Sequence, residues 1–281
     1  MKQCAACVIS GVEALLPAVL ESKQEELRLS LASRKYAGSR PASAQSHDVF
    51  QIVLHLMTSS VFRRRIVHGG SGLLRVIAGF LEQVASNEQF AKFQQDLFVV
   101  IEALSQDEGV LLAQHDAVLK ELCPTLASLL STRDGDTRFH ALKLISDILL
   151  VLLRDSGVYT HEAAAPVEST RLIDELLESK FLAKCSSILA DENPIPLFGL
   201  KLLSAVVERN PRMTQRLADM GLVPVFVAFL DLDHPNNNVH NLRLLESVAG
   251  LYVHGSGPVT AQSFGPRRCA MNTIYTYHDI S

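Results

Sequence analysis

The sequence predicts an all-α fold, an armadillo/HEAT-type right-handed α-solenoid of about five repeats, on three observations. The 281 residues are 48% hydrophobic but only 6% aromatic, with no Trp, which is typical of helices packed through aliphatic side chains. A short signature recurs in three helical patterns, as LKLIS at 142–146, LKLLS at 200–204 and LRLLES at 242–247. The last two signatures lie about 40 residues apart, which is the spacing of armadillo and HEAT repeats.

The N-terminal part of the chain continues this pattern of apolar helices. The first unit begins with a middle helix near Gly11 and closes with a helix over 49–57. The second unit has a short helix over 62–68, a turn at Gly69 and Gly70, and two longer helices. Those longer helices are predicted over 73–81 and 88–104, and a helix over 110–119 opens the third unit.

Each of the three signature helices follows another apolar helix, with a short polar break between them. Asp, Asn, Gly and Pro in the breaks are the residues that stop helices and cap the next ones. A short helix over 211–220 ends at Gly221, where glycine can adopt the left-handed conformation that closes a helix. This three-helix unit is the armadillo layout. The preceding helices are predicted over 122–130, 182–189 and 222–230, and the breaks over 131–136, 191–194 and 231–238.

Segments of loop composition interrupt the repeats. We expect loop insertions near 36–47 and 154–170, where Gly, Pro, Ser and Ala replace the helical pattern. Residues 1–254 are thus predicted to form the repeat domain. Residues 255–281 contain Gly, Pro and polar residues without helical period, and are predicted to be a disordered tail.

Charge and cysteine content exclude several classes of protein. The 26 basic and 30 acidic side chains are intermixed and give a formal net charge of -4, so no nucleic-acid partner is expected. No segment approaches the ~20 apolar residues of a membrane span, and the N-terminus is interpreted as a solenoid helix rather than a signal peptide. Five irregularly spaced cysteines indicate a reducing compartment, hence a cytoplasmic location. Cys4 and Cys7 form a CxxC without the second ligand pair that zinc requires.

The sequence contains no recognised catalytic motif. Phosphate-binding loops, the GxSxG elbow, the protein-kinase HRD and DFG signatures and HExxH are all absent. The adjacent His115 and Asp116 are interpreted as a surface pair, and Arg63–Arg65 as a solvated helix face. We therefore predict no enzyme activity, no cofactor and no metal. A catalytic site assembled from distant residues is the alternative that sequence leaves open.

The stretch ENPIPLFGLKLLSAVVERNPRMTQRLADMGLVPVFVAFL, over 192–230, resembles the C-terminal armadillo-type region of Fused-type kinases, in particular the Unc-51-like kinase four branch. The resemblance implies a kinase or pseudokinase domain N-terminal to this region in a parent protein, and a role in cilia or flagella. It does not carry kinase activity over to this chain. The predicted function is a protein-interaction scaffold, and the alternative is a regulatory segment of such a kinase.

Comparison with the armadillo repeats of nuclear-import adaptors yields candidate binding residues. In those adaptors the third helix of each repeat carries Trp and Asn four apart, facing a groove that binds basic peptides. The Trp positions correspond here to Lys143, Lys201 and Arg243, and the Asn positions to Asp147, Ala205 and Ser247. Three cations in register favour an acidic or phosphorylated protein or peptide. Ordinary solvated cations are the alternative, and Asp147 lies one turn from Lys143.

Overall fold

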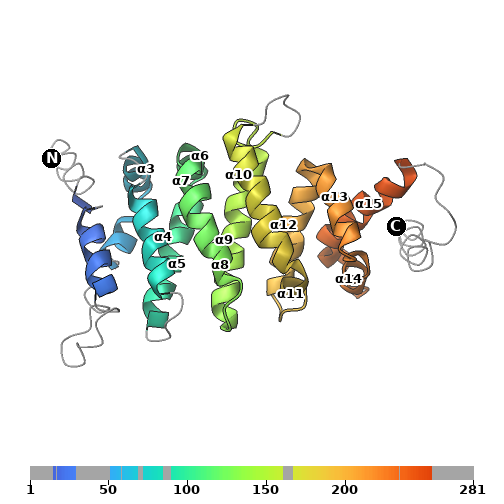
Figure 1. Cartoon of the computed structure of the whole chain (residues 1–281), viewed down its shortest axis with the longest axis horizontal. Helices are drawn as coiled ribbons and strands as arrows, with labels where there is room; N and C mark the ends of the chain where they lie inside the picture. The colour runs from blue at the N-terminus through green and yellow to red at the C-terminus, as the bar shows by residue number, and fades with distance from the viewer. Residues whose placement is uncertain are drawn as a thin grey trace. The chain divides into compact units, whose positions relative to one another are not determined.

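A computed structural model describes residues 15–16, 18–29, 51–57, 59–68, 72–84, 90–160, 167–233 and 235–254 (Figure 1). Every regular element in these ranges is helical, which confirms the all-α prediction. The predicted loop at 36–47, the predicted tail at 255–281 and the pair Cys4 and Cys7 lie outside the described residues. The chain divides into two compact units, Met1–Ala183 and Lys184–Ser281.

The first unit is built from successive helices. Residues 18–29 and 51–57 are helical and precede the labelled elements. The elements are α3 (Ser60–His68), α4 (Gly72–Val84), α5 (Ala91–Ser105), α6 (Glu108–Ala113), α7 (His115–Ala117), a π-helical turn (Val118–Leu122), α8 (Cys123–Leu129), α9 (Gly135–Arg154), α10 (Glu168–Leu176) and a second π-helical turn (Leu177–Phe181).

Second and third helices of the repeats form two layers within the first unit. The second helices α4 and α8 contact each other, and so do the third helices α5 and α9. Contacts between α4 and α5, and between α8 and α9, join the layers. Asp134 begins α9 by accepting a hydrogen bond from the Thr137 backbone N–H at 2.8 Å. The hydrogen bonds from Thr137 hold the pKa of Asp134 below its usual value.

The second unit repeats this arrangement. Its third helices α12 and α15 pack along each other, while α11 packs on α12 and α14 packs on α15. The short helix α13 contacts both third helices. A 3-10 turn (Leu182–Lys184) spans the boundary between the units, and the elements after it are α11 (Cys185–Leu189), α12 (Ile195–Arg209), α13 (Pro211–Asp219), α14 (Val223–Ala228), a second 3-10 turn (Pro235–Asn238) and α15 (Val239–His254).

The turn from first to second helix is made in two different ways. Gly221 has φ of 73°, and Leu222 N–H donates to Leu217 C=O at 3.2 Å, as in a Schellman motif. The equivalent positions in the two preceding repeats hold Glu121 and Lys180, which cannot adopt positive φ at low cost. Each lies inside a π-helical turn instead. The turn at Gly69 and Gly70 lies outside the described residues.

The repeat core is formed by the same register of successive third helices. The buried positions lie two residues after Val99, Lys143, Lys201 and Arg243. They are Ile101, Ile145, Leu203 and Leu245, and each side chain is at most 2% exposed. The thiols of Cys123 and Cys185 are also buried in helices, and burial raises the pKa of each to about 12. Both are therefore packing residues in the protonated form.

The structure corrects two details of the sequence prediction. The predicted helix over 110–119 is broken at Gln114, where the backbone leaves the helical region between α6 and α7. Arg63 is not part of a solvated helix face, because its side chain is only 18% exposed. It donates to the Met57 carbonyl and lies 3.8 Å from Asp107, whereas Arg64 is exposed as predicted.

Candidate functional site

Two of the predicted cations, Lys201 and Arg243, lie on neighbouring third helices of the second unit. Because α12 and α15 pack along each other, Ser204, one turn after Lys201, contacts His240, one turn before Arg243. One turn before each cation lies an apolar side chain, Leu197 on α12 and Val239 on α15. Leu197 is 49% exposed and Val239 48% exposed. We call Leu197, Lys201, Val239, His240 and Arg243 the α12–α15 surface.

Each cation on this surface has a local partner. Arg243 Nη1 lies 2.9 Å from Glu208 Oε1, an ion pair between α15 and α12 in which both side chains are about half exposed. Lys201 Nζ lies 5.9 Å from the centre of the Phe198 ring, in the range of a cation–π contact. Exposed pairs of this kind contribute about 0–1 kcal/mol, so an incoming anion can replace them at little cost.

His240 is the half-buried centre of the α12–α15 surface. Its Nδ1 lies 2.9 Å from Ser204 Oγ, and the Ser204 hydroxyl donates its hydrogen to the Lys201 carbonyl at 2.9 Å. Because a hydroxyl has one hydrogen, both contacts are hydrogen bonds when Nδ1 carries the ring hydrogen and donates it to Ser204. The neutral ring then carries its lone pair on Nε2, which has no hydrogen-bond partner among the described residues.

The surroundings of His240 favour its neutral form. Burial lowers its pKa most, Arg243 and Lys201 lower it further, and Glu208 acts in the opposite direction. Both predicted cations are thus close enough to His240 to act on its charge.

The third predicted cation, Lys143, has a different environment in the first unit. Its Nζ lies 2.5 Å from Glu102 Oε1 on α5 and 3.7 Å from Asp147, one turn further along α9. Two carboxylates therefore compensate its charge. His140, at the register of His240, stacks on Phe98 with ring centres 5.4 Å apart.

Sequence reasoning missed the residues that surround the cations. The partners Glu102 and Glu208 precede Lys143 and Arg243 by 41 and 35 residues, so no local pattern connects them. Leu197 and Val239 carried a usable signal, since they stand at fixed offsets from the predicted cations. Ala205 and Ser247, at the Asn positions of the adaptors, are half-buried, and Ser247 donates to the Arg243 carbonyl.

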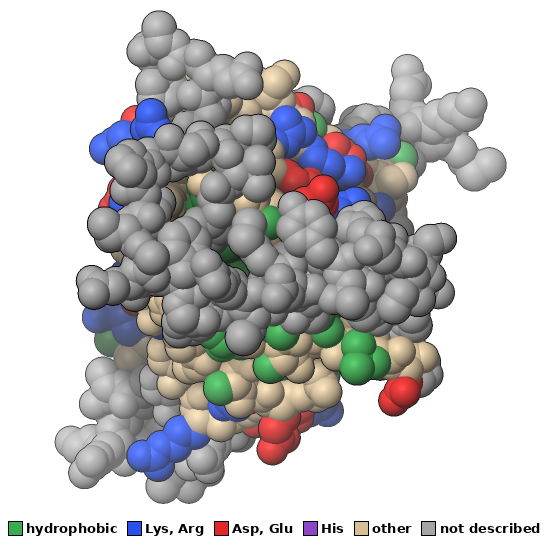
Figure 2. Space-filling model, turned by 90° about the vertical axis from the view of Figure 1, so that its right-hand side faces the viewer, with side chains coloured by type: hydrophobic (Ala, Val, Ile, Leu, Met, Phe, Trp, Pro, Cys, Tyr) green, Lys and Arg blue, Asp and Glu red, His purple; other side chains and the backbone are tan. Residues whose placement is uncertain are grey.

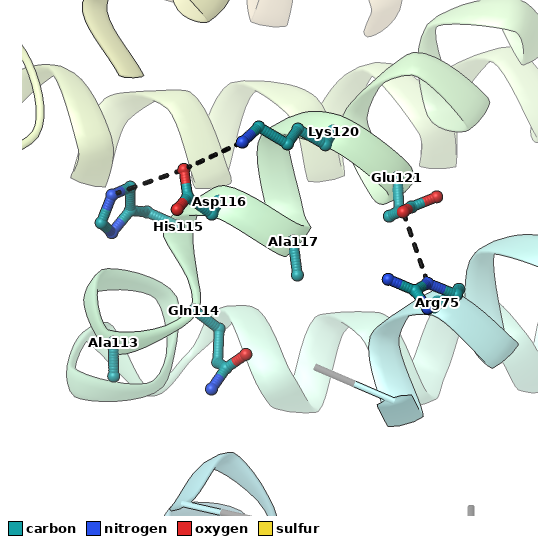
Figure 3. A pocket seen from close by; sticks show the side chains of 8 residues that line it. All are labelled: Arg75, Ala113, Gln114, His115, Asp116, Ala117, Lys120 and Glu121. Atoms are coloured by element: carbon teal, nitrogen blue, oxygen red, sulfur yellow. Dashed lines mark ion pairs between the residues drawn. The ribbon is translucent and has the colours of Figure 1, made fainter. Parts of the chain in front are cut away.

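A polar pocket of about 340 Å³ lies in the first unit, around α7 (Figure 3). His115 Nε2 and Lys120 Nζ lie 3.9 and 3.7 Å from Asp116 Oδ1, which agrees with the predicted surface pair. Across the pocket, Arg75 pairs with Glu121 at 3.4 Å. Since the charges of both signs are matched within the pocket, it has no marked preference for an anion or a cation.

Surface charge is mixed elsewhere too. Figure 2 shows basic and acidic side chains as neighbours on the described part of the face drawn there, without a broad area of one sign. Within the described ranges, no three His, Cys, Asp or Glu side chains are placed to hold a metal ion. No helix in the described part of the chain has the length and apolar character of a membrane span.

Several named proteins are similar in sequence to this chain. Residues 15–215 match the family described as serine/threonine-protein kinase ULK4-like, HEAT repeats. Serine/threonine-protein kinase RUNKEL of Arabidopsis thaliana is 25% identical over 256 residues, which cover 89% of this chain and 18% of the relative. Serine/threonine-protein kinase ULK4 of Mus musculus is 28% identical over 215 residues, 71% of this chain and 16% of the relative. The chain thus spans less than a fifth of each.

A solved structure supports the fold. A designed armadillo repeat protein matches with a TM-score of 0.50 and 11% identity, over 89% of this chain and 98% of that chain. This confirms the predicted solenoid of armadillo/HEAT-type repeats. Together with the family match, which spans well over half of the chain, it confirms the resemblance found in the sequence. The chain belongs to the HEAT-repeat family of ULK4-like serine/threonine-protein kinases.

Proposed function

We propose that this chain is a protein-interaction scaffold that binds an acidic segment of a partner protein on the α12–α15 surface. The observation that carries the proposal is the pairing of exposed apolar and cationic side chains on two packed helices. Leu197 and Val239 offer the apolar contacts, and Lys201 and Arg243 the charges. A peptide with carboxylates or phosphates next to apolar residues would contact both the cations and the apolar side chains.

The apolar and the cationic side chains of the α12–α15 surface have different roles in binding. Apolar burial contributes about 25 cal/mol per Å², so Leu197 and Val239 supply much of the affinity. The cations select the sign of the ligand, because a basic segment would place like charges beside them. Lys143 has the equivalent register position in the first unit, but Glu102 and Asp147 compensate its charge. We therefore expect Lys143 to contribute less to binding than Lys201 and Arg243.

The alternative function is regulation of a kinase-like domain carried elsewhere on a longer polypeptide. The family and the names of both curated relatives support it, since both relatives are called serine/threonine-protein kinases and are much longer than this chain. In that case the acidic segment belongs to the kinase-like domain or its linker. A location at cilia or flagella is part of this proposal and rests on the family resemblance, whereas the cytoplasmic location rests on the irregular spacing of the five cysteines.

A charge reversal tests the binding surface. In the double variant Lys201→Glu/Arg243→Glu, we expect affinity for acidic peptides with embedded Leu or Phe to fall at least tenfold, because attraction becomes repulsion at two positions. The measurement is fluorescence anisotropy with labelled acidic, neutral and basic peptides of the same apolar residues, at low and high salt. Wild-type affinity for the acidic peptide should fall as salt is raised.

The matched control reverses two cations of α13 in the same unit, Arg212→Glu/Arg216→Glu, and should retain acidic-peptide binding. Both variants must keep the wild-type melting temperature. The proposed surface would be refuted if both double variants lost acidic-peptide affinity equally, or if the wild type bound the basic peptide more tightly than the acidic one. Binding of the purified kinase domain of a curated relative, abolished by the first pair only, would support the regulatory alternative.

A further inference from the structure

We propose that Lys201, His240 and Arg243 bind a phosphomonoester group on the partner segment, and that His240 takes up a proton when they do. This inference rests on the proposed function, because it specifies the ligand of the same surface. It adds a third ligand-binding residue, His240, to the two predicted cations. It also makes the affinity depend on pH near neutrality.

The hydrogen bonds of His240 determine how it can meet an anion. Its Nδ1–H is used by Ser204, which is itself fixed by donation to the Lys201 carbonyl. The remaining nitrogen, Nε2, is an acceptor in the neutral ring and would repel a phosphate oxygen. Only the protonated ring presents an N–H at Nε2, so an anion bound there requires an additional proton from solvent.

Burial lowers the pKa of His240 most, and the charged groups around the ring modify this effect. On α12 these groups are Lys201 and Glu208, and on α15 the group is Arg243. The helix α14 and the 3-10 turn before α15 carry no charged side chain, and the charged residues of α13 do not shift the His240 pKa. A bound dianion would neutralise Lys201 and Arg243, which removes the repulsion that lowers the His240 pKa.

Phosphate fits this set of donors better than a carboxylate does. It has three terminal oxygens and a charge of about -1.5 to -2 at pH 7, whereas a carboxylate has two oxygens and a single charge. The ammonium, the imidazolium and the guanidinium each supply a charged donor. Glu208 competes for the guanidinium, since it pairs with Arg243 at 2.9 Å when no ligand is bound.

The test uses the full chain and three peptides that share one apolar frame, with Ser, Glu or phosphoserine at the central position. We expect the phosphoserine peptide to bind at least tenfold more tightly than the Glu peptide at pH 6.5. This preference should fall as pH rises to 8, with a limiting slope of about tenfold per pH unit for one linked proton. Below pH 6 the preference for the phosphoserine peptide should stop increasing, because the phosphate takes up its own second proton at a pKa of about 6.

Two variants separate the contributions. In His240→Asn the amide can still donate to Ser204 but does not titrate, so the pH dependence between 6.5 and 8 should disappear while the melting temperature is retained. Glu208→Gln removes the competing carboxylate and should strengthen phosphoserine binding several-fold at every pH. The His240 ring signals in NMR should show a raised pKa when the phosphoserine peptide is bound.

The outcomes distinguish the two levels of the proposal. If the Glu and phosphoserine peptides bind equally, or if His240→Asn keeps the wild-type pH dependence, the phosphate site is refuted while the scaffold function stands. If neither peptide binds better than the Ser peptide, both the site and the proposed acidic partner are refuted. Tighter phosphoserine binding that is lost at high pH only in the wild type supports the inference.

Discussion

Replacement of Leu203 or Leu245 by Ala is expected to lower the free energy of unfolding by about 2–5 kcal/mol. Both side chains are almost completely buried, at 0% and 1% exposed, at the same register of two packed third helices. The loss combines the transfer of the removed carbons with the cavity that remains, since neighbours in a packed core relax only partly. Urea denaturation followed by circular dichroism measures the change.

Leu197→Ala is the matched control, with the same chemical change on the same helix as Leu203. Because Leu197 is half exposed, its replacement should cost at most about 0.5 kcal/mol. In a repeat protein each repeat contacts only its neighbours, so amide exchange should show the damage concentrated in the second unit. A loss below ~1 kcal/mol for both Leu203→Ala and Leu245→Ala would show that the assigned core face of the third helices is wrong.

Asn238→Ala is expected to destabilise the second unit by about 2 kcal/mol or more, since each buried polar group left unpaired costs about 1–3 kcal/mol. The Asn238 side chain closes the loop between α14 and α15: its Oδ1 accepts from Asp231 N–H and its Nδ2 donates to the Asp231 carbonyl, both at 2.8 Å. Asn238 is fully buried and directly precedes α15.

The adjacent Asn237 offers a matched control for this loop. It is exposed and donates a single hydrogen bond, of 3.0 Å, to the Asp231 carboxylate, so Asn237→Ala should change stability by less than about 0.5 kcal/mol. Because His240 lies two residues after Asn238, the first variant should also shift the His240 ring signals in NMR. Equal effects of the two replacements on unfolding would contradict the role assigned to Asn238.

The repeat architecture could be predicted from sequence because it depends on short-range periodicity. The helices around Leu142, Leu200 and Leu242 lie where the recurring signature places them, and the turn at Gly221 has the left-handed backbone that the glycine predicted. Buried positions such as Leu203 follow from the same period of apolar residues.

The π-helical turns could not be predicted in the same way. Glu121 and Lys180 replace the glycine of the turn, and both are ordinary helix residues by propensity. Only the structure shows that Leu122 and Phe181, the last residues of the two π-helical turns, are buried in the core. The burial of Arg63 is likewise a tertiary effect, because its partner Asp107, the residue before α6, is distant in sequence.

The candidate site was predictable only in part. Register alone identified Lys201 and Arg243, because equivalent positions of stacked helices share one surface. The ion pair with Glu208 and the hydrogen bond between Ser204 and His240 depend on how α12 and α15 face each other, which periodicity does not specify. These contacts change the prediction from three equivalent cations to a two-helix surface centred on His240.

Site-specific photocrosslinking tests the central claim, that a partner binds on the α12–α15 surface. A photoreactive amino acid is placed at Leu197, at Val239 or at Met220, which are 49%, 48% and 42% exposed respectively. Met220 directly follows α13 in the same unit and is the control for exposure alone. The proposal predicts crosslinks to an acidic apolar peptide from positions 197 and 239 but not from position 220. Crosslinks from position 220 with none from 197 or 239 would place the partner elsewhere and contradict the proposed surface.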